Sequence, residues 1–161
     1  MHRLSLIIAC LSLVVQDAAC RHAASPDADA PAAVTINGRT WRVELAVTPP
    51  QRYQGLSGRP SLPGDRGMLF VFEKPQALSF CMRGCLIDLD IAFIDADRRV
   101  LSVQTMYVEP DRLGLRAYQS PAPALYALET PAGQMSSAAV KPGDMASFSR
   151  NVPAPAKSLS E

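Results

Sequence analysis

Short strand-forming runs separated by turn signals constrain the fold of this chain more than any other feature. The clearest turn signal is Asn37-Gly38, which stands between two such runs. A type I′ turn needs positive φ at both central residues, and Asn-Gly is a pair that readily supplies it. The run that follows alternates apolar and polar side chains over residues 41–47, which is typical of a half-buried strand. The sequence therefore predicts a β-hairpin at the start of a β-rich domain.

Further strand-forming runs follow, and helical signals are few. Strands are expected at 67–72, 77–82, 85–95, 100–108, 124–130 and 145–150. Thr48 and Gln51 can form a capping box at a helix start, but Gly55 and Gly58 limit that helix to about two turns. Residues 132–140 have room for one more helical turn. No alternating βαβ rhythm is visible, so we predict an all-β fold of about seven to nine strands, a compact sandwich or a partly closed barrel.

The two ends of the chain differ in composition from its middle. A basic start and an apolar run precede the small-residue stretch DAAC, which predicts a signal peptide over residues 1–20. The apolar run is shorter than the roughly 20 residues that a membrane-spanning helix needs. Residues 21–33 and 151–161 are rich in Ala, Pro and Ser and are expected to be a disordered tether and tail around one domain at 34–150. We therefore expect an exported protein of the periplasm or cell envelope.

Cys20 bears on how the protein would be held at the membrane. It follows Ala18 and Ala19 as the lipidated cysteine of a bacterial lipobox does, but Asp17 stands where such motifs carry Leu or Val. Lipidation at Cys20 and plain cleavage near residue 20 both stay open. Membrane contact is expected only through such an N-terminal lipid anchor.

Charge and histidine content restrict the partners and the chemistry. Lys and Arg number 16 against 15 Asp and Glu, a formal net charge of +1. Nucleic-acid binders carry a clustered basic excess, so a nucleic-acid partner is not expected. The two histidines, His2 and His22, lie outside the expected domain. The domain therefore has no imidazole for a catalytic triad or a usual zinc site, and we expect no metal and no cofactor.

Cys81 and Cys85 bracket Met82-Arg83-Gly84, a spacing that has three interpretations. A three-residue hairpin loop favours Gly at its last position, where Gly84 stands, and would set the two cysteines opposite each other. Outside the cytoplasm such a pair tends to oxidise, so a structural disulfide is the leading hypothesis. Free buried or half-buried thiols come second. A redox or metal site comes last, because the spacing is not Cys-x-x-Cys and histidine ligands are missing.

Asp88 and Asp90 would share one face of the strand expected at 85–95, about 6.8 Å apart along it. That separation is compatible with two carboxylates acting as acid and base on a glycosidic bond. It suits equally well two solvated or turn-bonding carboxylates at the polar edge of a strand. We favour this plainer interpretation, because many exposed strands carry such pairs.

Four segments resemble a known family. They are QRYQGLSGRPSLPGDRGMLFVF, LSFCMRGCLIDLDIAFIDADRRV, AYQSPAPALYALETPAG and VKPGD. In their order and content they are similar to the bacterial and archaeal family called domain of unknown function 192, over about residues 42–148. The resemblance implies a compact β-rich, sandwich-like domain that is often exported. It implies no reaction, because the activity of the family is not established.

The cysteine segment departs from the family at several positions. From Ser79 the family pattern reads Ser-Phe-Trp-Met-Lys-Asn-Thr, then Leu-Ile-Pro-Leu-Asp-Ile-Ala-Phe. Here Cys81 replaces the Trp, Gly84-Cys85 replaces Asn-Thr and Asp88 replaces the Pro, whereas Asp90 follows the pattern. The resemblance therefore weakens the carboxylate pair as a family mechanism and makes the cysteines a local substitution.

Six polar residues that match the family have no obvious core role: Arg59, Arg83, Asp90, Tyr118, Ser120 and Glu129. They form either a buried network that holds loops to the sheet or a polar cleft at one end of the β fold. On the second interpretation the protein is a noncatalytic envelope module that binds a small molecule, a glycan or a protein partner. The alternative is a carboxylate-based envelope enzyme acting on glycans, with Asp90 and either Glu129 or Asp88 as acid and base. A third hypothesis is an assembly factor that only holds a partner.

Overall fold

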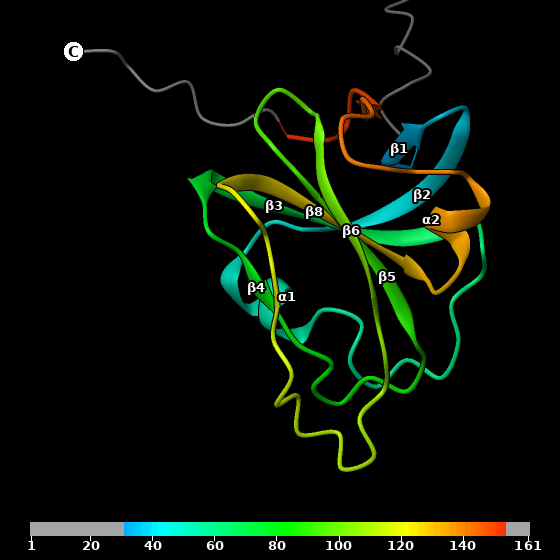
Figure 1. The fold of residues 1–161 in the computed structure, drawn as a ribbon, viewed down its shortest axis with the longest axis vertical. Coiled ribbons are helices and arrows are strands. Elements are labelled where there is room, and N and C mark those ends of the chain that lie inside the picture. The colour runs from blue at the N-terminus through cyan, green and yellow to red at the C-terminus, as the bar shows by residue number, and fades with distance from the viewer. Residues whose placement is uncertain (1–30, 154–161) are drawn as a thin grey trace, which may run out of the picture.

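The computed structural model describes residues 31–153, which fold into nine strands and two short helices. In chain order these are β1 (Ala33–Ile36), β2 (Arg39–Ala46), α1 (Pro49–Gln54), β3 (Arg66–Gln76), β4 (Ser79–Phe80), β5 (Leu89–Ile94), β6 (Val100–Met106), β7 (Tyr118–Gln119), β8 (Ala124–Pro131), α2 (Gln134–Ser137) and β9 (Ser147–Phe148). Seven strands form one curled half-barrel sheet in the order β6-β5-β8-β3-β2-β1-β9, and β4 pairs with β7 in a second, two-stranded sheet (Figure 1). The predicted all-β class is confirmed.

The hairpin expected at Asn37-Gly38 is present. Asn37 has a φ of 50° and Gly38 a φ of 78°, so both central residues of the turn lie in the left-handed region. β1 and β2 pair antiparallel, with Ile36 opposite Arg39 across the turn. The local turn chemistry alone was sufficient to place these two strands.

One connection differs from the sequence prediction. β2 and β3 are parallel neighbours, and α1 lies in the crossover between them, so the fold contains one βαβ unit. The sequence showed no such rhythm because α1 has only six residues and none of them is buried. A helix of that length has too few apolar residues to show a helical period.

The large sheet is buried on both faces. β3, β5 and β8 lie inside it, and their side chains alternate between two apolar clusters. The Trp41 cluster, on one face, includes Val34, Trp41, Leu69, Ala92, Ile94 and Leu128. The Phe93 cluster, on the other face, includes Met68, Phe70, Leu89, Ile91, Phe93 and Ala127. Leu89, Ile91 and Phe93 therefore lie on the opposite face of β5 from Ala92 and Ile94.

The cysteine segment is not the predicted hairpin. β4 pairs with β7, not with β5, and β5 begins at Leu89 instead of residue 85. Ser120 holds this alternative pairing in place, because its backbone N–H donates to the Leu78 carbonyl and its hydroxyl accepts from the Leu78 N–H. Gly84 does have the expected positive φ of 66°, but it belongs to an irregular turn.

The described region slightly exceeds the predicted domain. Ala33, assigned to the tether, is part of β1, and Val152, assigned to the tail, is buried against the Trp41 cluster. The predicted signal peptide, Cys20 and the rest of the tether and tail lie outside the described residues. Between residues 31 and 153, neither helix is long and apolar enough to cross a membrane.

Candidate functional site

A cleft of about 430 Å³ opens on the Phe93-cluster side of the sheet, beside α1. Three parts of the chain enclose it. Its lining consists of Pro49, Arg52, Tyr53, Gln54, Gly55, Leu56 and Ser57 from α1 and the turn after it, Phe70, Phe72 and Glu129 from β3 and β8, and Ser79, Phe80, Cys81, Arg83 and Cys85 from β4 and the turn that follows. Apolar and aromatic groups predominate, with a few polar ones, which is the usual composition of a small-molecule site.

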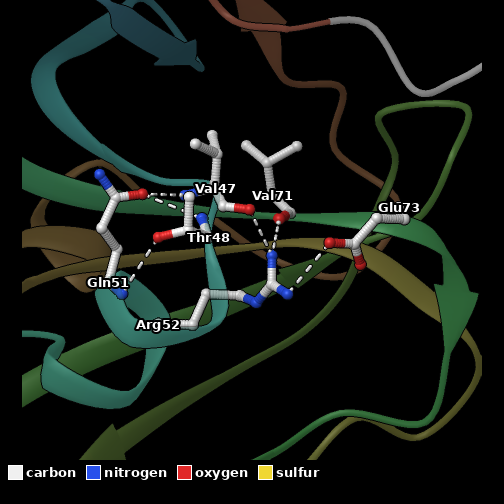
Figure 2. A network of polar contacts seen from close by, with 6 residues as sticks. All are labelled: Val47, Thr48, Gln51, Arg52, Val71 and Glu73. Atoms are coloured by element: carbon white, nitrogen blue, oxygen red, sulfur yellow. Dashed lines mark hydrogen bonds and ion pairs between the residues drawn. The ribbon is translucent and has the colours of Figure 1, made fainter.

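The α1 wall is fixed to the sheet by capping and by one arginine (Figure 2). The Thr48 hydroxyl accepts from the Gln51 N–H, and the Gln51 side chain accepts from the Thr48 N–H, which is the capping box expected from the sequence. Arg52 reaches from α1 to the carbonyl oxygens of Val47 and Val71, at 2.7 and 2.9 Å. These contacts fasten a helix that would be too short to persist alone.

The opposite wall is the turn at residues 82–85, and its backbone is held on two sides. The Ser57 hydroxyl donates to the Arg83 carbonyl at 2.7 Å, and the Gly84 N–H donates to the Arg112 carbonyl at 2.9 Å. A Cβ on Gly114 would lie 2.7 Å from the Arg83 backbone nitrogen, so only glycine permits this close approach. The two walls of the cleft are therefore held mainly by hydrogen bonds from side chains to backbone groups.

Aromatic rings line the cleft between these walls. Phe70 and Phe80 pack edge to face, with ring centroids 4.8 Å apart. The Arg83 guanidinium lies 3.7 Å from the centroid of the Tyr53 ring and donates a hydrogen bond to the Tyr53 carbonyl. The cleft thus offers flat apolar surfaces, with one arginine stacked on Tyr53.

Glu129 is the one carboxyl group in the lining, and it is deeply buried. Its exposed fraction is 5%, and within residues 31–153 no hydrogen bond or ion pair reaches its side chain. The residues directly opposite it on the two neighbouring strands are apolar, Met68 on β3 and Ile91 on β5. Burial without a compensating charge raises the pKa of Glu129 to about 8. A carboxyl in this state is poised to hydrogen-bond or pair with something that enters the cleft.

The two cysteines also line the cleft, and both are free, with Cys81 exposed and Cys85 buried. Burial, the nearby Glu129 carboxyl and Cys81 raise the pKa of the Cys85 thiol to about 11. Such a thiol is a weak nucleophile near neutral pH. The disulfide stays a prediction. In the described part of the chain, no group of three or more His, Cys, Asp and Glu side chains is arranged to hold a metal ion.

Of the six predicted site residues, only Arg83 and Glu129 line this cleft. Arg59 pairs with Glu44 at a different surface depression. Tyr118 is buried, and its hydroxyl accepts a hydrogen bond from the Tyr107 N–H. The Ser120 hydroxyl accepts one from the Leu78 N–H. These three residues connect loops and strands, so they fit the alternative of a structural network.

Asp90 also lies away from the cleft, on the other face of the sheet. Its carboxylate accepts from the Thr105 hydroxyl at 2.8 Å and from the Met135 N–H at 3.0 Å, which ties α2 to β5. Asp90 and Glu129 therefore cannot act on the same bond. Asp88 precedes β5, is exposed, and accepts from the Val108 N–H. The plainer interpretation, two carboxylates at an exposed polar strand edge, is therefore wrong for Asp90, which is buried in the interior strand β5, while Asp88 is exposed.

Sequence reasoning missed most of the lining. Arg52 and Leu56 were included only within a segment that resembles the family, and Gly55 also as a limit to the helix. Phe70 and Phe72 were included as strand residues, and Phe80 as a strand residue in the family pattern. Gly55 was a usable signal, because its φ of 50° lies in the left-handed region that favours glycine. No signal in the sequence indicates that α1 lies beside Glu129, because the parallel crossover was not visible.

Comparison with known proteins agrees with the resemblance seen in the sequence. Residues 32–148, well over half of the chain, match domain of unknown function 192, described as uncharacterised ACR. A crystal structure of a protein of unknown function from Novosphingobium aromaticivorans DSM 12444 is 32% identical, with a TM-score of 0.66, over 71% of this chain and 83% of that one. A second, from Sinorhizobium meliloti 1021 and described as a proposed transcription regulator, is 33% identical, with a TM-score of 0.66, over 74% and 94%. No curated protein matches the chain. The chain belongs to the domain of unknown function 192 family.

Proposed function

We propose that this protein is a noncatalytic binding module of the cell envelope that takes a small molecule into the cleft beside α1. The observation that carries the proposal is Glu129, a carboxyl with an exposed fraction of 5% that lines the cleft and accepts no hydrogen bond from the described residues. A polar group buried in this way costs free energy unless something satisfies it. A bound ligand would supply the hydrogen-bond partner that the described residues do not provide.

The remaining features of the cleft favour binding over catalysis. A glycosidase-type mechanism uses two carboxyl groups that flank the scissile bond, and the cleft lining holds only Glu129. Cys85 has a raised pKa, and the lining holds no histidine to activate it, while the nearby Glu129 carboxyl disfavours the thiolate. The location in the envelope rests on the signal peptide predicted for residues 1–20.

An NMR screen tests the proposal. A panel of small aromatic and aliphatic molecules is titrated into the ¹⁵N-labelled domain, and we expect chemical-shift changes confined to residues 49–57, 79–85 and the neighbourhood of Glu129. Shifts scattered over the surface, or none with any compound, would contradict a binding function for this cleft.

A blocked variant provides the matched control. Ser79→Trp adds a large side chain at an exposed position in the cleft lining, and Ser147→Trp adds the same side chain at the exposed first residue of another two-residue strand. We expect Ser79→Trp to abolish binding and Ser147→Trp to preserve it. Unchanged binding in Ser79→Trp would place the ligand elsewhere.

A further inference from the structure

Resting on the proposed function, we infer that the ligand of this cleft carries a protonated amine, which binds the Glu129 carboxylate while an apolar body contacts the aromatic walls. Three features of the cleft support this ligand class: the unused acceptor capacity of Glu129, the arginines that already have partners, and the aromatic rings of the lining.

The surroundings of Glu129 leave its acceptor capacity unused. Met68 and Ile91 flank it on the neighbouring strands, and neither can donate a hydrogen bond. No donor within residues 31–153 reaches its side chain, and its exposed fraction of 5% leaves little contact with solvent. Because an ionised carboxylate accepts several hydrogen bonds, a ligand with several N–H donors on one atom matches it best.

The arginines of the cleft do not provide a counter-charge. Arg52 donates to the carbonyl oxygens of Val47 and Val71 and to the Glu73 carboxylate. Arg83 is stacked on the Tyr53 ring and donates to its carbonyl. Neither arginine lowers the pKa of Glu129, for which burial is the only cause of the shift. Within residues 31–153, no positive charge therefore stabilises this carboxylate, and a cationic ligand would supply one.

The rings of the cleft suit an organic cation with an apolar body. Two aromatic side chains already hold cations, since Arg52 lies 4.8 Å from the Phe72 ring centroid and Arg83 lies 3.7 Å from that of Tyr53. Phe80 remains in the lining as a half-buried apolar ring, and the buried Phe70 ring packs edge to face against it. A neutral ligand can exchange hydrogen bonds with Glu129 but brings no charge to offset that of the carboxylate. An ammonium makes charge-assisted hydrogen bonds, which are about twice as strong.

The inference predicts a specific pH dependence. The titratable or charged groups that share the lining with Glu129 are Arg52, Tyr53, Cys81, Arg83 and Cys85. With a pKa of about 8, Glu129 must lose a proton before it can pair with an ammonium. Amine affinity should therefore rise about tenfold per pH unit between pH 6 and pH 7 and level off above pH 8, until the amine itself deprotonates. A neutral acceptor would show the opposite trend, because it needs the protonated acid.

Three probes with the same ring system distinguish the ligand classes: 1-naphthylmethylamine, 1-naphthalenemethanol and 1-naphthoate. Their affinities are measured by NMR titration of residues 31–153 within the full mature chain, at pH 6, 7 and 8.5. At pH 8.5 we expect the amine to bind at least about tenfold more tightly than the alcohol. Glu129→Gln should remove that preference, and Glu44→Gln, which changes a carboxyl paired with Arg59 outside the cleft, should retain it.

The outcomes separate this inference from the proposed function. If the alcohol or the naphthoate occupies the cleft as tightly as the amine, the amine inference is overturned and the binding function stands. If Glu129→Gln binds the amine as well as the unmodified protein does, the inference is also overturned. If none of the three probes affects the cleft, both fail. The pH profile of the unmodified protein needs no variant, so the inference can be refuted even if Glu129→Gln folds poorly.

Discussion

Asp90 and Glu129 are buried carboxyls on the neighbouring strands β5 and β8, on opposite faces of one sheet. Asp90 accepts hydrogen bonds from Thr105 and from Met135 at the start of α2. Glu129 accepts none from the described residues and lines a cleft instead. Both follow the family pattern, so the pattern alone does not separate a structural carboxyl from one that is available to a ligand. The two carboxyls differ in what lies over their face of the sheet: α2 bonds to Asp90, whereas a cleft lies beside Glu129.

The largest expected effect concerns the pH dependence of stability. Glu129 has a pKa of about 8 in the folded protein against an ordinary value of 4.5, so between these values the folded state holds more protons than the unfolded state. Its contribution to stability is therefore lost as the pH rises through this window, by about 3 kcal/mol from pH 5 to pH 8. Glu129→Gln should remove that loss, as measured by urea unfolding at each pH. Parallel pH profiles for the two proteins would show that Glu129 has a partner after all.

Removing the Asp90 carboxyl should destabilise the protein, in contrast to removing the Glu129 carboxyl. Asp90→Ala leaves the Thr105 hydroxyl and the Met135 N–H without their acceptor, and we expect a loss of roughly 2–3 kcal/mol in the free energy of unfolding at pH 7. Asp90→Asn, which keeps one acceptor oxygen, should lose less. Urea unfolding measures both variants. The contrast between the two carboxyls would collapse if Asp90→Ala were as stable as the unmodified protein.

A smaller effect tests whether the α1 wall of the cleft is already ordered before a ligand binds. Thr48→Ala removes the side-chain half of the α1 capping box and should cost about 1 kcal/mol of stability. Because the cap holds the first turn of α1, which forms one wall of the cleft, amide exchange should also accelerate at residues 51–54. Ser61→Ala, at an exposed loop position, is the control. If exchange in α1 is unchanged, the wall is held by Arg52 and the sheet instead of by the cap.

The smallest change concerns the thiols. Cys81 is exposed and Cys85 is buried with a pKa of about 11, so iodoacetamide at pH 8 should alkylate Cys81 well before Cys85. Intact-mass spectrometry without reductant follows the two additions. Equal rates would contradict the burial of Cys85. No addition until reductant is present would indicate the predicted disulfide.

Local signals in the sequence were sufficient for much of the fold. Asn37-Gly38 placed the first hairpin, and Thr48 with Gln51 placed the start of α1, because turn and cap geometry depend on adjacent residues. The alternation of side chains along β5, with Ile91 and Phe93 on one face and Ala92 on the other, likewise follows from the local backbone. Such features need no knowledge of distant strands.

The remaining features depend on long-range pairing, which the sequence pattern does not encode. Cys81 was placed in a hairpin with β5 because the two segments are adjacent in the chain, yet β4 pairs with β7 nearly 40 residues away. The six polar candidates were grouped without their sheet positions, so Glu129 was set beside Asp90 although the two face opposite ways. The register of each strand decides which face of the sheet a side chain lies on, and the sequence pattern does not give that register.

The most direct test of the account is a ¹³C NMR titration of the Glu129 side-chain carboxyl, assigned by its disappearance in Glu129→Gln. The account predicts a pKa of about 8 in the free protein, which falls when the cleft is saturated with 1-naphthylmethylamine. A pKa near 4.5 in the free protein would contradict an unpartnered buried carboxyl, and with it the central claim about the cleft.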